Sequence, residues 1–445
     1  MPFGSARNCD EDSVLKRLVR SLIGEEGVLL THRLRGRLAA FFYGYPARKL
    51  KVIGVTGTNG KTTTAFMIAR ILEESGKVVG MATTVEFRVA KRRTRNTVKM
   101  TTLSPFALQR LLKEMVEADC EYAVLEITSH AIKQERIHGI PFDTVVFTNL
   151  THDHLDYHQS FEDYRATKVK LFEMHPHVAV VNADDKSASF FLKPPIEKKI
   201  TYGLHGGADV QAGQLKFLTQ ATILELTAYG ERLEFSLPIP GKFNVYNALA
   251  ATGAALGIGV DLPLVTRALG TFQGVPGRME KVDQGQPFVV YVDYAHTPDA
   301  FQQIYATTRP ATSGKIIHVF GATGDRDKTK RPLLGAIAAQ HADYLVVTDE
   351  DPYSEDPVAI MNAVADGVIR ASRSSRTRKV DGVHFWKILD RREAIAKALS
   401  LAKRGDIVLL TGKGDENVMV VGDEKVPWDD REVAREELAK LGYQR

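Results

Sequence analysis

Cysteine is almost absent from this chain of 445 residues, which contains only Cys9 and Cys120. Two isolated thiols provide neither a disulfide framework nor a cysteine-rich metal site. The sequence also lacks an uncharged apolar run of about 18 residues, so no membrane-spanning helix is expected. The amino-terminal residues include acids and no apolar core of the kind that a secretion signal requires. These absences favour a protein of the reducing cytoplasm.

Acidic residues are missing between Gly27 and Leu72, although the net charge of the whole chain is only +5. The basic residues of that interval are Arg33, Arg35, Arg37, Arg48, Lys49, Lys51, Lys61 and Arg70, and a second basic stretch covers residues 91–95. Such patches suit an anionic partner, and a solvated basic surface explains them equally well. No nucleic-acid-binding module accompanies them, so nucleic-acid binding is not expected.

Residues 1–48 are expected to form a short helical segment. Ser13 is a candidate cap for a helix whose leucines and valines recur at helical spacing. A second helix is expected over His32–Tyr43, where arginines mix with leucines and phenylalanines, and Pro46 ends it. A basic amphipathic helix of this kind can make weak contact with an anionic membrane surface, although packing on its own domain is commoner.

The rest of the chain predicts an α/β protein, and its length predicts two or three domains. From Lys51 onward, apolar runs typical of buried strands alternate with helical stretches such as Phe161–Phe172. This alternation indicates a mainly parallel sheet with helices on both faces. Short alternating runs between residues 205 and 237 predict a small antiparallel addition. A hinge at residues 274–278 precedes a second α/β series, and the charged residues 370–378 are expected to be flexible surface sequence. The expected units are a helical segment (1–48), a central P-loop-type domain (49–277) and a Rossmann-like carboxyl-terminal domain (278–445).

A glycine-rich turn between an expected strand and an expected helix is the clearest chemical motif. It lies in LKVIGVTGTNGKTTT, residues 50–64, and the helix that follows is expected over Ala65–Glu74. Backbone N–H groups of such a turn and the helix N-terminus face phosphates, Lys61 would reach the outer ones, and Thr62 or Thr63 would hold Mg²⁺. Val55 stands where the strict Walker pattern has glycine, so the loop is a tighter variant. Its phosphate-facing residues would be Gly57, Thr58, Asn59, Gly60, Lys61, Thr62 and Thr63.

Further polar groups follow other expected strands. Glu126 ends one strand, where it can hold Mg²⁺ near the phosphates or serve as a cap. Residues 152–158 contain three histidines and two aspartates. Because cysteine partners and HExxH spacing are absent, a zinc site is disfavoured. A Mg²⁺ site with one histidine and oxygen ligands is the preferred hypothesis, and a purely structural polar loop is the alternative. The charge run at residues 325–331 follows a strand and favours anion binding over a solvated loop.

Together these motifs resemble the Mur ligases, the ATP-dependent amino acid ligases of peptidoglycan precursor synthesis. The chain looks most like their MurE-type members, which add the third residue of the stem peptide. The resemblance covers residues 51–442 and rests on TGTNGKTTT, LEITSH, FTNLTHDHLDYH, YRATKVKLF, GKFNVYNALAA, GVPGRME, VDYAHTPDA, GATGDRDKTKRP and TGKGDE. It implies a monomeric enzyme in which a substrate carboxylate attacks the γ-phosphate of ATP. The incoming amine then attacks the resulting acyl phosphate.

The resemblance also implies roles for individual residues. Lys61 would hold the outer phosphates. Thr62 and Glu126 would bind one Mg²⁺, and His154 would contribute to a second. Lys168 matches a lysine that family members carbamylate, which would make it an anionic metal ligand. The implied nucleotide contacts are Asn247, Asp293 and Arg331, and Arg278 matches the hinge. The positions that match the acceptor site are Thr101, Thr102, Ser129, Gln134 and Arg136.

Two departures from the family pattern concern the substrates. MurE-type enzymes usually carry a nucleotide-sugar-binding domain before the loop, and the 48 residues available here are too few for it. The acceptor would then be a UDP-muramoyl dipeptide held by the central domain, or another carboxylate such as a folate, a cyanophycin-like polymer or a lipid-linked precursor. A nucleotide-binding regulatory protein without ligase activity is the remaining alternative, disfavoured because the motif residues are retained.

The second departure lies in the carboxyl-terminal domain, which would bind the incoming amino acid. Diaminopimelate-adding members resemble Asp-Asn-Pro-Arg, whereas this chain has Glu350, Asp351, Pro352 and Tyr353. Tyrosine cannot form the bidentate ion pair that an arginine makes with a distal carboxylate. In the motif that begins at Gly412, Asp415 replaces a common histidine, while Glu416 matches an amino-acid contact. The added acids predict a basic or neutral amino acid over meso-diaminopimelate.

Overall fold

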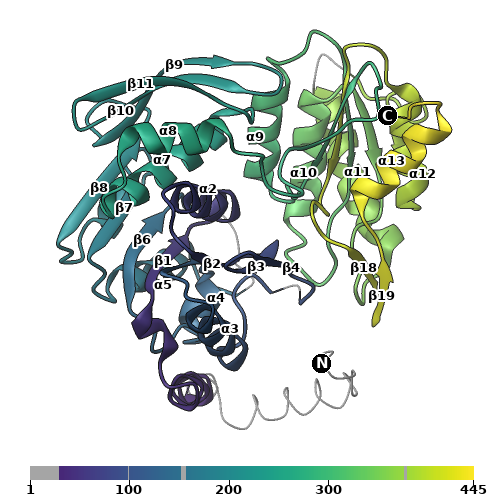
Figure 1. The fold of residues 1–445 in the computed structure, drawn as a ribbon. Helices are drawn as coiled ribbons and strands as arrows, with labels where there is room; N and C mark the ends of the chain where they lie inside the picture. Colours follow the sequence, from purple (N-terminus) through teal and green to yellow (C-terminus); the bar gives the residue numbers. More distant parts are fainter. Residues whose placement is uncertain (1–29, 99, 152–156, 375–377, 445) are drawn as a thin grey trace.

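The computed structural model describes residues 30–98, 100–151, 157–374 and 378–444. Within these residues, the strands form two large sheets that lie in separate halves of the molecule (Figure 1). An 11-stranded sheet has the order β11-β10-β9-β8-β7-β6-β1-β5-β2-β3-β4, and a 6-stranded sheet has the order β12-β13-β17-β14-β15-β16. A small hairpin, β18-β19, completes the set.

The central sheet is parallel through its middle and antiparallel at both edges. Strands β9 to β2 in the sheet order pair in parallel, while β3-β4 and β10-β11 add antiparallel hairpins. This arrangement confirms the expected mainly parallel sheet with an antiparallel addition. The strands are β1 (Lys51–Thr56), β2 (Val79–Ala82), β3 (Glu86–Val89), β4 (Arg92–Arg95), β5 (Tyr122–Glu126), β6 (Phe142–Phe147), β7 (Val178–Asn182), β8 (Lys198–Gly203), β9 (Val210–Phe217), β10 (Thr222–Ala228) and β11 (Glu231–Leu237).

Helices cover both faces of the central sheet with separate apolar cores. One face packs against α2 (Lys61–Glu74), α7 (Lys242–Gly257) and α8 (Leu262–Gly270). The other packs against α3 (Pro105–Glu117), α4 (Ser129–Lys133), α5 (Phe161–Phe172) and α6 (Ala188–Phe191). Small residues let α7 lie close to the sheet, because a Cβ at Gly253 would come within 2.7 Å of Val180.

The second sheet is also covered on both faces. Its strands are β12 (Glu280–Val282), β13 (Val289–Asp293), β14 (Ile316–Phe320), β15 (Tyr344–Val347), β16 (Phe385–Lys387) and β17 (Ile407–Thr411). The helices α9 (Pro298–Thr308), α10 (Lys330–His341) and α11 (Pro357–Ser374) pack on one side, and α12 (Arg391–Leu401) and α13 (Asp430–Lys440) on the other. The hairpin strands are β18 (Val418–Val421) and β19 (Glu424–Pro427).

Two expected boundaries differ from the structure. The helix expected from Ala65 begins at Lys61, because Gly60 adopts φ 83° and turns the chain directly into the helix. The expectation of flexible sequence from Arg370 was wrong in part, since α11 continues to Ser374. A buried stripe that includes Val364 and Val368 anchors this helix.

The amino-terminal segment is described from residue 30 onward, so the helix expected after Ser13 lies outside the described residues. Residues 30–42 are helical, and the short 3-10 turn η1 (Pro46–Lys49) follows. Small side chains bring this helix onto the central unit: a Cβ at Gly36 would lie 2.6 Å from the carbonyl of Glu135. None of the described helices combines the length and apolarity needed to cross a membrane.

Candidate functional site

The glycine-rich loop connects β1 to α2 at the carboxyl edge of the central sheet. Gly57 and Gly60 adopt φ 150° and φ 83°. A Cβ at Gly57 would lie 1.9 Å from Thr148 Oγ1, and one at Gly60 would lie 2.2 Å from Asn247 Oδ1. Glycine is therefore required at both positions, and the backbone N–H groups of the loop and of the helix N-terminus form a cradle that suits phosphate.

The end of β6 holds this loop in place. The backbone carbonyl of Asn149 accepts a hydrogen bond from the backbone N–H of Thr58 at 2.8 Å. The side-chain oxygen of Asn149 accepts one from the backbone N–H of Asn59 at 2.9 Å. The Thr148 hydroxyl donates to the Asn59 carbonyl at 2.7 Å. At the start of the helix, the Lys61 ammonium donates to the Thr58 carbonyl at 2.7 Å, so its charge lies within the cradle.

Oxygen ligands suitable for Mg²⁺ meet beside the loop. The Thr62 hydroxyl donates to Glu126 Oε2 at 3.0 Å, and both groups are buried. The backbone N–H and hydroxyl of Thr84 also donate to this oxygen, at 3.0 Å and 3.1 Å. Hydroxyl and carboxylate oxygens are the donors that Mg²⁺ prefers, so this set fits the ion. Sequence reasoning missed Thr84, because it lies in a turn without a recognisable motif.

Lys168 lies on α5 and points at the same loop. Its side chain is 1% exposed, and its ammonium donates to the Gly57 carbonyl at 2.8 Å. The ammonium also lies 3.5 Å from Thr56 Oγ1 and 4.7 Å from the centre of the Tyr164 ring. The structure thus brings Lys168 to the phosphate loop, which its place in the sequence did not indicate.

The residues expected to hold the acceptor gather around the ends of β5 and α4. The Thr101 hydroxyl accepts from Thr84 at 3.0 Å, and Thr102 donates to the Glu126 carbonyl at 2.9 Å. Arg136 donates to the Thr102 carbonyl at 2.9 Å and to Gln134 Oε1 at 2.8 Å.

Ser129 contacts a histidine that sequence reasoning left unassigned. His158 Nε2 lies 3.0 Å from Ser129 Oγ, and its Nδ1 lies 3.2 Å from Asp163. Burial lowers the pKa of this imidazole. His154 lies outside the described residues, and the described part of the chain contains no group of at least three His, Cys, Asp and Glu side chains that could hold a metal.

The expected nucleotide contacts come from both sheets. Asn247 on α7 lies beside the loop and accepts from Thr64 Oγ1 at 3.4 Å. Asp293 ends β13, and its two oxygens accept backbone N–H groups of Met279 and Ala295 at 2.7 Å each. Burial raises the pKa of Asp293. Asp293 therefore also ties the segment after the hinge to the second sheet.

The hydrogen bonds of Arg331 on α10 go to residues of the second unit and not to the glycine loop. Arg331 forms a two-pronged ion pair with Glu355, at 2.8 Å and 3.0 Å, and this pair lowers the pKa of Glu355 to about 2. Its Nε–H is buried and donates to no acceptor among the described residues. The Nε–H group of this guanidinium is therefore an unused donor.

The loops after β15 and β17 form a second cluster. Lys413 is fully buried and donates to Asp351 and Glu416 at 2.7 Å each. Sequence reasoning missed this lysine, although it lies inside the quoted TGKGDE motif. A Cβ at Gly412 would lie 2.3 Å from Glu350 Oε2, so these loops pack directly on each other. Tyr353 adopts φ 50° and is half-buried, with Arg326 5.9 Å from its ring centre.

The two clusters are connected by contacts between the sheets. Asn59 of the glycine loop donates to Asp299 at the start of α9 at 2.8 Å. Arg95 on β4 donates to the carbonyl of Asp415 and pairs with Asp429 at 3.2 Å. Arg278 lies 3.4 Å from Asp415 Oδ1. The carboxyl edges of both sheets therefore meet around one region.

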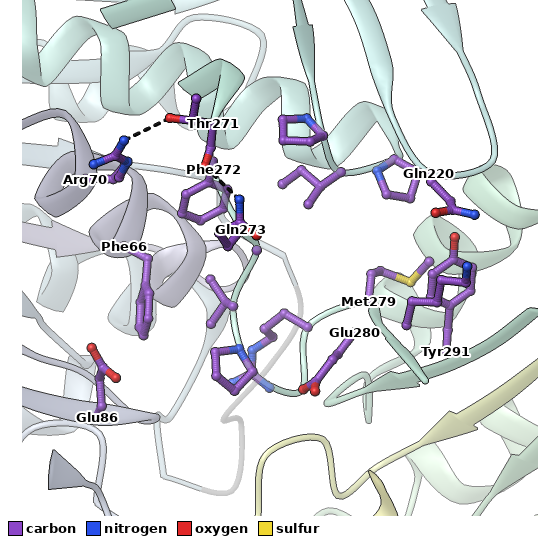
Figure 2. Close-up of a pocket in the computed structure, with 18 of the residues that line it drawn as sticks. Phe66, Arg70, Glu86, Gln220, Thr271, Phe272, Gln273, Met279, Glu280 and Tyr291 are labelled. Carbon is purple, nitrogen blue, oxygen red and sulfur yellow. Dashed lines mark hydrogen bonds between the residues drawn. The ribbon is translucent and has the colours of Figure 1, made fainter. Parts of the chain in front are cut away.

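A cavity of ≈ 820 Å³ lies beside residues 274–278 rather than at the glycine loop (Figure 2). Phe66 and Arg70 of α2 line one side, while Met279 and Tyr291 of the second unit line the opposite side. Among its described lining residues, none belongs to residues 57–63. This space lies between the two units and is distinct from the phosphate cradle.

Comparisons with known proteins agree with the division into two sheets. Residues 55–255 match the Mur ligase middle domain, and residues 277–414 match the Mur ligase, glutamate ligase domain. A UDP-N-acetylmuramyl-tripeptide synthetase of Roseiflexus sp. (strain RS-1) is 43% identical over 422 residues, which cover 91% of this chain and 82% of the relative. A UDP-N-acetylmuramoyl-L-alanyl-D-glutamate–2,6-diaminopimelate ligase of Bacillus velezensis is 40% identical over 412 residues, covering 91% and 81%. A solved structure of a ligase with that same description superposes with a TM-score of 0.65 at 31% identity, covering 92% of this chain and 84% of that one.

Proposed function

This chain belongs to the Mur ligase family, and on that basis we propose that it is a MurE-type, ATP-dependent ligase. It would add an amino acid to a UDP-MurNAc-peptide acceptor in peptidoglycan synthesis, as a monomer in the cytoplasm. The observation that carries the proposal is the meeting of two sheet edges. One bears a phosphate cradle with an oxygen ligand pair, and the other bears a cluster of buried charges.

The chemistry of this reaction needs charge neutralisation and positioning more than covalent help from the protein. The acceptor carboxylate attacks the γ-phosphorus of ATP, ADP leaves, and an acyl phosphate forms. The amine then attacks the acyl carbon, phosphate leaves, and the amine loses a proton. Lys61 would turn from the Thr58 carbonyl to the outer phosphates. Mg²⁺ held by Thr62 and Glu126 would offset their negative charge.

We propose that residues 49–277 bind the nucleotide and the acceptor, and that residues 278–445 bind the incoming amino acid. The acceptor would lie along Thr101, Thr102, Ser129, Gln134 and Arg136. The nucleotide would contact Asn247, Asp293 and Arg331, with the unused Nε of Arg331 as a donor. His154 would add to a second Mg²⁺ site.

Lys168 is proposed to be carbamylated. The reaction joins the neutral amine to CO₂ and releases a proton, and it places a carboxylate where an ammonium now lies. The position supports this assignment because the side chain is buried against the phosphate loop. An oxygen ligand there would serve a metal ion, whereas a lysine ammonium would repel it.

The helix of residues 30–42 is proposed to make a weak contact with anionic membrane surfaces. It docks on the protein through the small residues Gly36, Ala39 and Ala40, which are buried. Its large apolar side chains lie exposed: Leu30, Leu34, Leu38, Phe41 and Phe42, at 57%, 50%, 58%, 74% and 74%.

At about 100° per residue, these exposed side chains cover an arc of about 120° that points away from the docked face. Arg35 borders one side of this arc and Arg37 the other, and both are exposed. An apolar arc with basic borders is the pattern of helices that lie in a membrane interface.

The test of the ligase function is phosphate release from ATP and Mg²⁺ with UDP-muramoyl dipeptide and a panel of amino acids, with products weighed by mass spectrometry. A product one amino acid heavier than the acceptor is expected. The variant Lys61→Ala should lower the rate at least about 100-fold, since it removes a charge from the transition state. Lys216→Ala, which changes an exposed lysine on β9, is the matched control. Nucleotide binding without any product would contradict this acceptor and direct the search to another carboxylate.

A further inference from the structure

Two buried carboxylates in the second cluster have an oxygen that accepts no hydrogen bond from the described residues. Glu350 is 4% exposed; its Oε1 accepts from the Thr323 hydroxyl at 2.7 Å, but its Oε2 has no donor. Asp415 is 6% exposed, and its Oδ1 accepts no hydrogen bond, although Arg278 lies 3.4 Å away. Leaving a buried carboxylate oxygen without a donor is costly.

No neighbouring cation among the described residues donates a hydrogen bond to either of these two oxygens. Lys413 is already held between Asp351 and Glu416, at 2.7 Å from each. The backbone N–H of Val420 also donates to Asp351 at 2.7 Å, so that carboxylate is satisfied within the protein. Asp415 has an ion pair with Arg278 at 3.4 Å that is not a hydrogen bond, whereas Glu350 has no ion pair among the described residues.

Both of these oxygens belong to loops that lie at one edge of the second sheet. Glu350 Oε2 packs against Gly412, and Asp415 lies three residues further along the same loop. The partly buried Tyr294 adjoins the second of these loops, because a Cβ at Gly414 would lie 2.7 Å from its Cβ. Burial and the negative charges of Glu416, Asp415 and Glu350 raise the pKa of its hydroxyl. Asp415 also lies beside Arg278 of the hinge, and thus faces the junction of the two units.

We propose that these oxygens accept the side-chain ammonium of the incoming amino acid. The enzyme would then select a basic amino acid of the lysine or ornithine class and reject one with a distal carboxylate. This inference rests on the proposed ligase function, and it specifies the amine substrate of the same site. The bound ammonium would supply the donors that Glu350 and Asp415 lack.

The surroundings also disfavour a second carboxylate in the substrate. Like charges repel strongly where water is excluded, so a distal carboxylate would be placed against Glu350 and Asp415. Tyr353 offers a single hydroxyl, and it cannot provide the planar two-donor fork that an arginine presents to a carboxylate. The relative from Bacillus velezensis is described by the diaminopimelate that it adds, so the inference predicts a difference in amine substrate between similar chains.

The test compares kcat/KM for L-lysine, L-ornithine, L-norleucine and meso-diaminopimelate, with ATP, Mg²⁺ and UDP-muramoyl dipeptide. Norleucine keeps the length of lysine and lacks only the ammonium. We expect lysine or ornithine to exceed norleucine and diaminopimelate by about 100-fold or more, because a site built to bind a polar group rejects analogues without it.

Variants of Glu350 and Asp415 test whether these two side chains cause the preference for a basic amino acid. Glu350→Gln keeps the side-chain shape and should lower kcat/KM for the basic amino acid about 10-fold to 100-fold, and it should lower the ratio of kcat/KM for lysine to that for norleucine. Asp415→Asn provides a second variant if the first fails to fold. Glu197→Gln, at a side chain that is 81% exposed, is the matched control.

The outcomes separate this inference from the function on which it rests. Preference for diaminopimelate or norleucine would overturn the inference and leave the ligase function standing. Absence of product with every amino acid, from a folded protein that binds ATP, would overturn the ligase function itself. An equal loss for lysine and norleucine in Glu350→Gln would assign Glu350 a structural role only.

Discussion

At the scale of single residues, the main feature is the buried charge of Lys168 at the phosphate loop. Lys168 is 1% exposed, yet its ammonium contacts the carbonyl of Gly57 in a loop that is proposed to bind phosphates and Mg²⁺. Burying a lysine is costly unless its charge is used or removed. Carbamylation would convert this position from a cation beside a metal site into an oxygen ligand for it.

We expect Lys168→Ala to lower kcat at least about 100-fold, because the variant loses an oxygen ligand near the transferred phosphate. Acetate or another small carboxylate should restore part of the activity in a concentration-dependent manner, measured by phosphate release. Lys170→Ala, at an exposed lysine on the same helix, controls for changes in α5. Full activity of the unrescued Lys168→Ala variant would end the carbamate proposal.

At the scale of elements, the helix of residues 30–42 reverses the usual distribution of side chains. Surface helices normally bury their large apolar residues and expose small and polar ones. Here Gly36, Ala39 and Ala40 are buried, while Phe41 and Phe42 are each 74% exposed. The small residues allow close docking, as Gly139 shows: a Cβ there would come within 2.8 Å of Ala40.

This helix should bring the protein to anionic vesicles. We expect co-sedimentation with phosphatidylglycerol vesicles at low salt, weaker binding at high salt, and no binding to phosphatidylcholine vesicles, because arginine–lipid attraction is screened by salt. The double variant Phe41→Ser and Phe42→Ser should abolish binding.

Phe217→Ser, which removes an exposed aromatic ring on β9, is the matched control for this vesicle experiment. Failure of the intact protein to bind the anionic vesicles would refute the membrane contact. Self-association that disappears in the double variant would instead identify a second copy as the partner.

At the scale of the whole molecule, a few polar contacts join the two sheets across the candidate site. The β3-β4 hairpin extends from the central sheet toward the carboxyl-terminal unit (Figure 1). Its Arg95 pairs with Asp429 and with the carbonyl of Asp415. The second cluster is thereby linked to the central sheet through a side chain that is 38% exposed.

We expect Arg95→Ala to raise KM for the amino acid about 10-fold with little change in thermal stability, since a partly exposed ion pair contributes about 0.2–1 kcal/mol to folding. Steady-state kinetics and thermal melting measure the two effects. Arg92→Ala is the control, because Arg92 lies on the same strand and pairs with Glu114 inside the central unit. Equal kinetic effects of the two variants would contradict a role for Arg95 in positioning the units.

Local patterns were sufficient to predict most of the fold. The strand–turn–helix of the phosphate loop, the helix Phe161–Phe172 and the change to antiparallel strands near β10 all follow from hydrophobic periodicity and glycine placement. The β3-β4 hairpin was missed, because its charged strand residues resemble a solvated basic patch. Pairing with β2 stabilises this hairpin, and such pairing is invisible in a local window.

The sequence by itself determined the family, the two α/β units and the residue types that can bind phosphate and Mg²⁺, since these depend on local spacing and side-chain chemistry. Only the tertiary structure decided which charges neutralise one another. Asp351 is paired with Lys413 and Glu350 Oε2 has no donor, although the two acids are adjacent in the chain. Pairing of this kind depends on side chains that come from separate strands, and their distances and burial arise only when the sheet assembles.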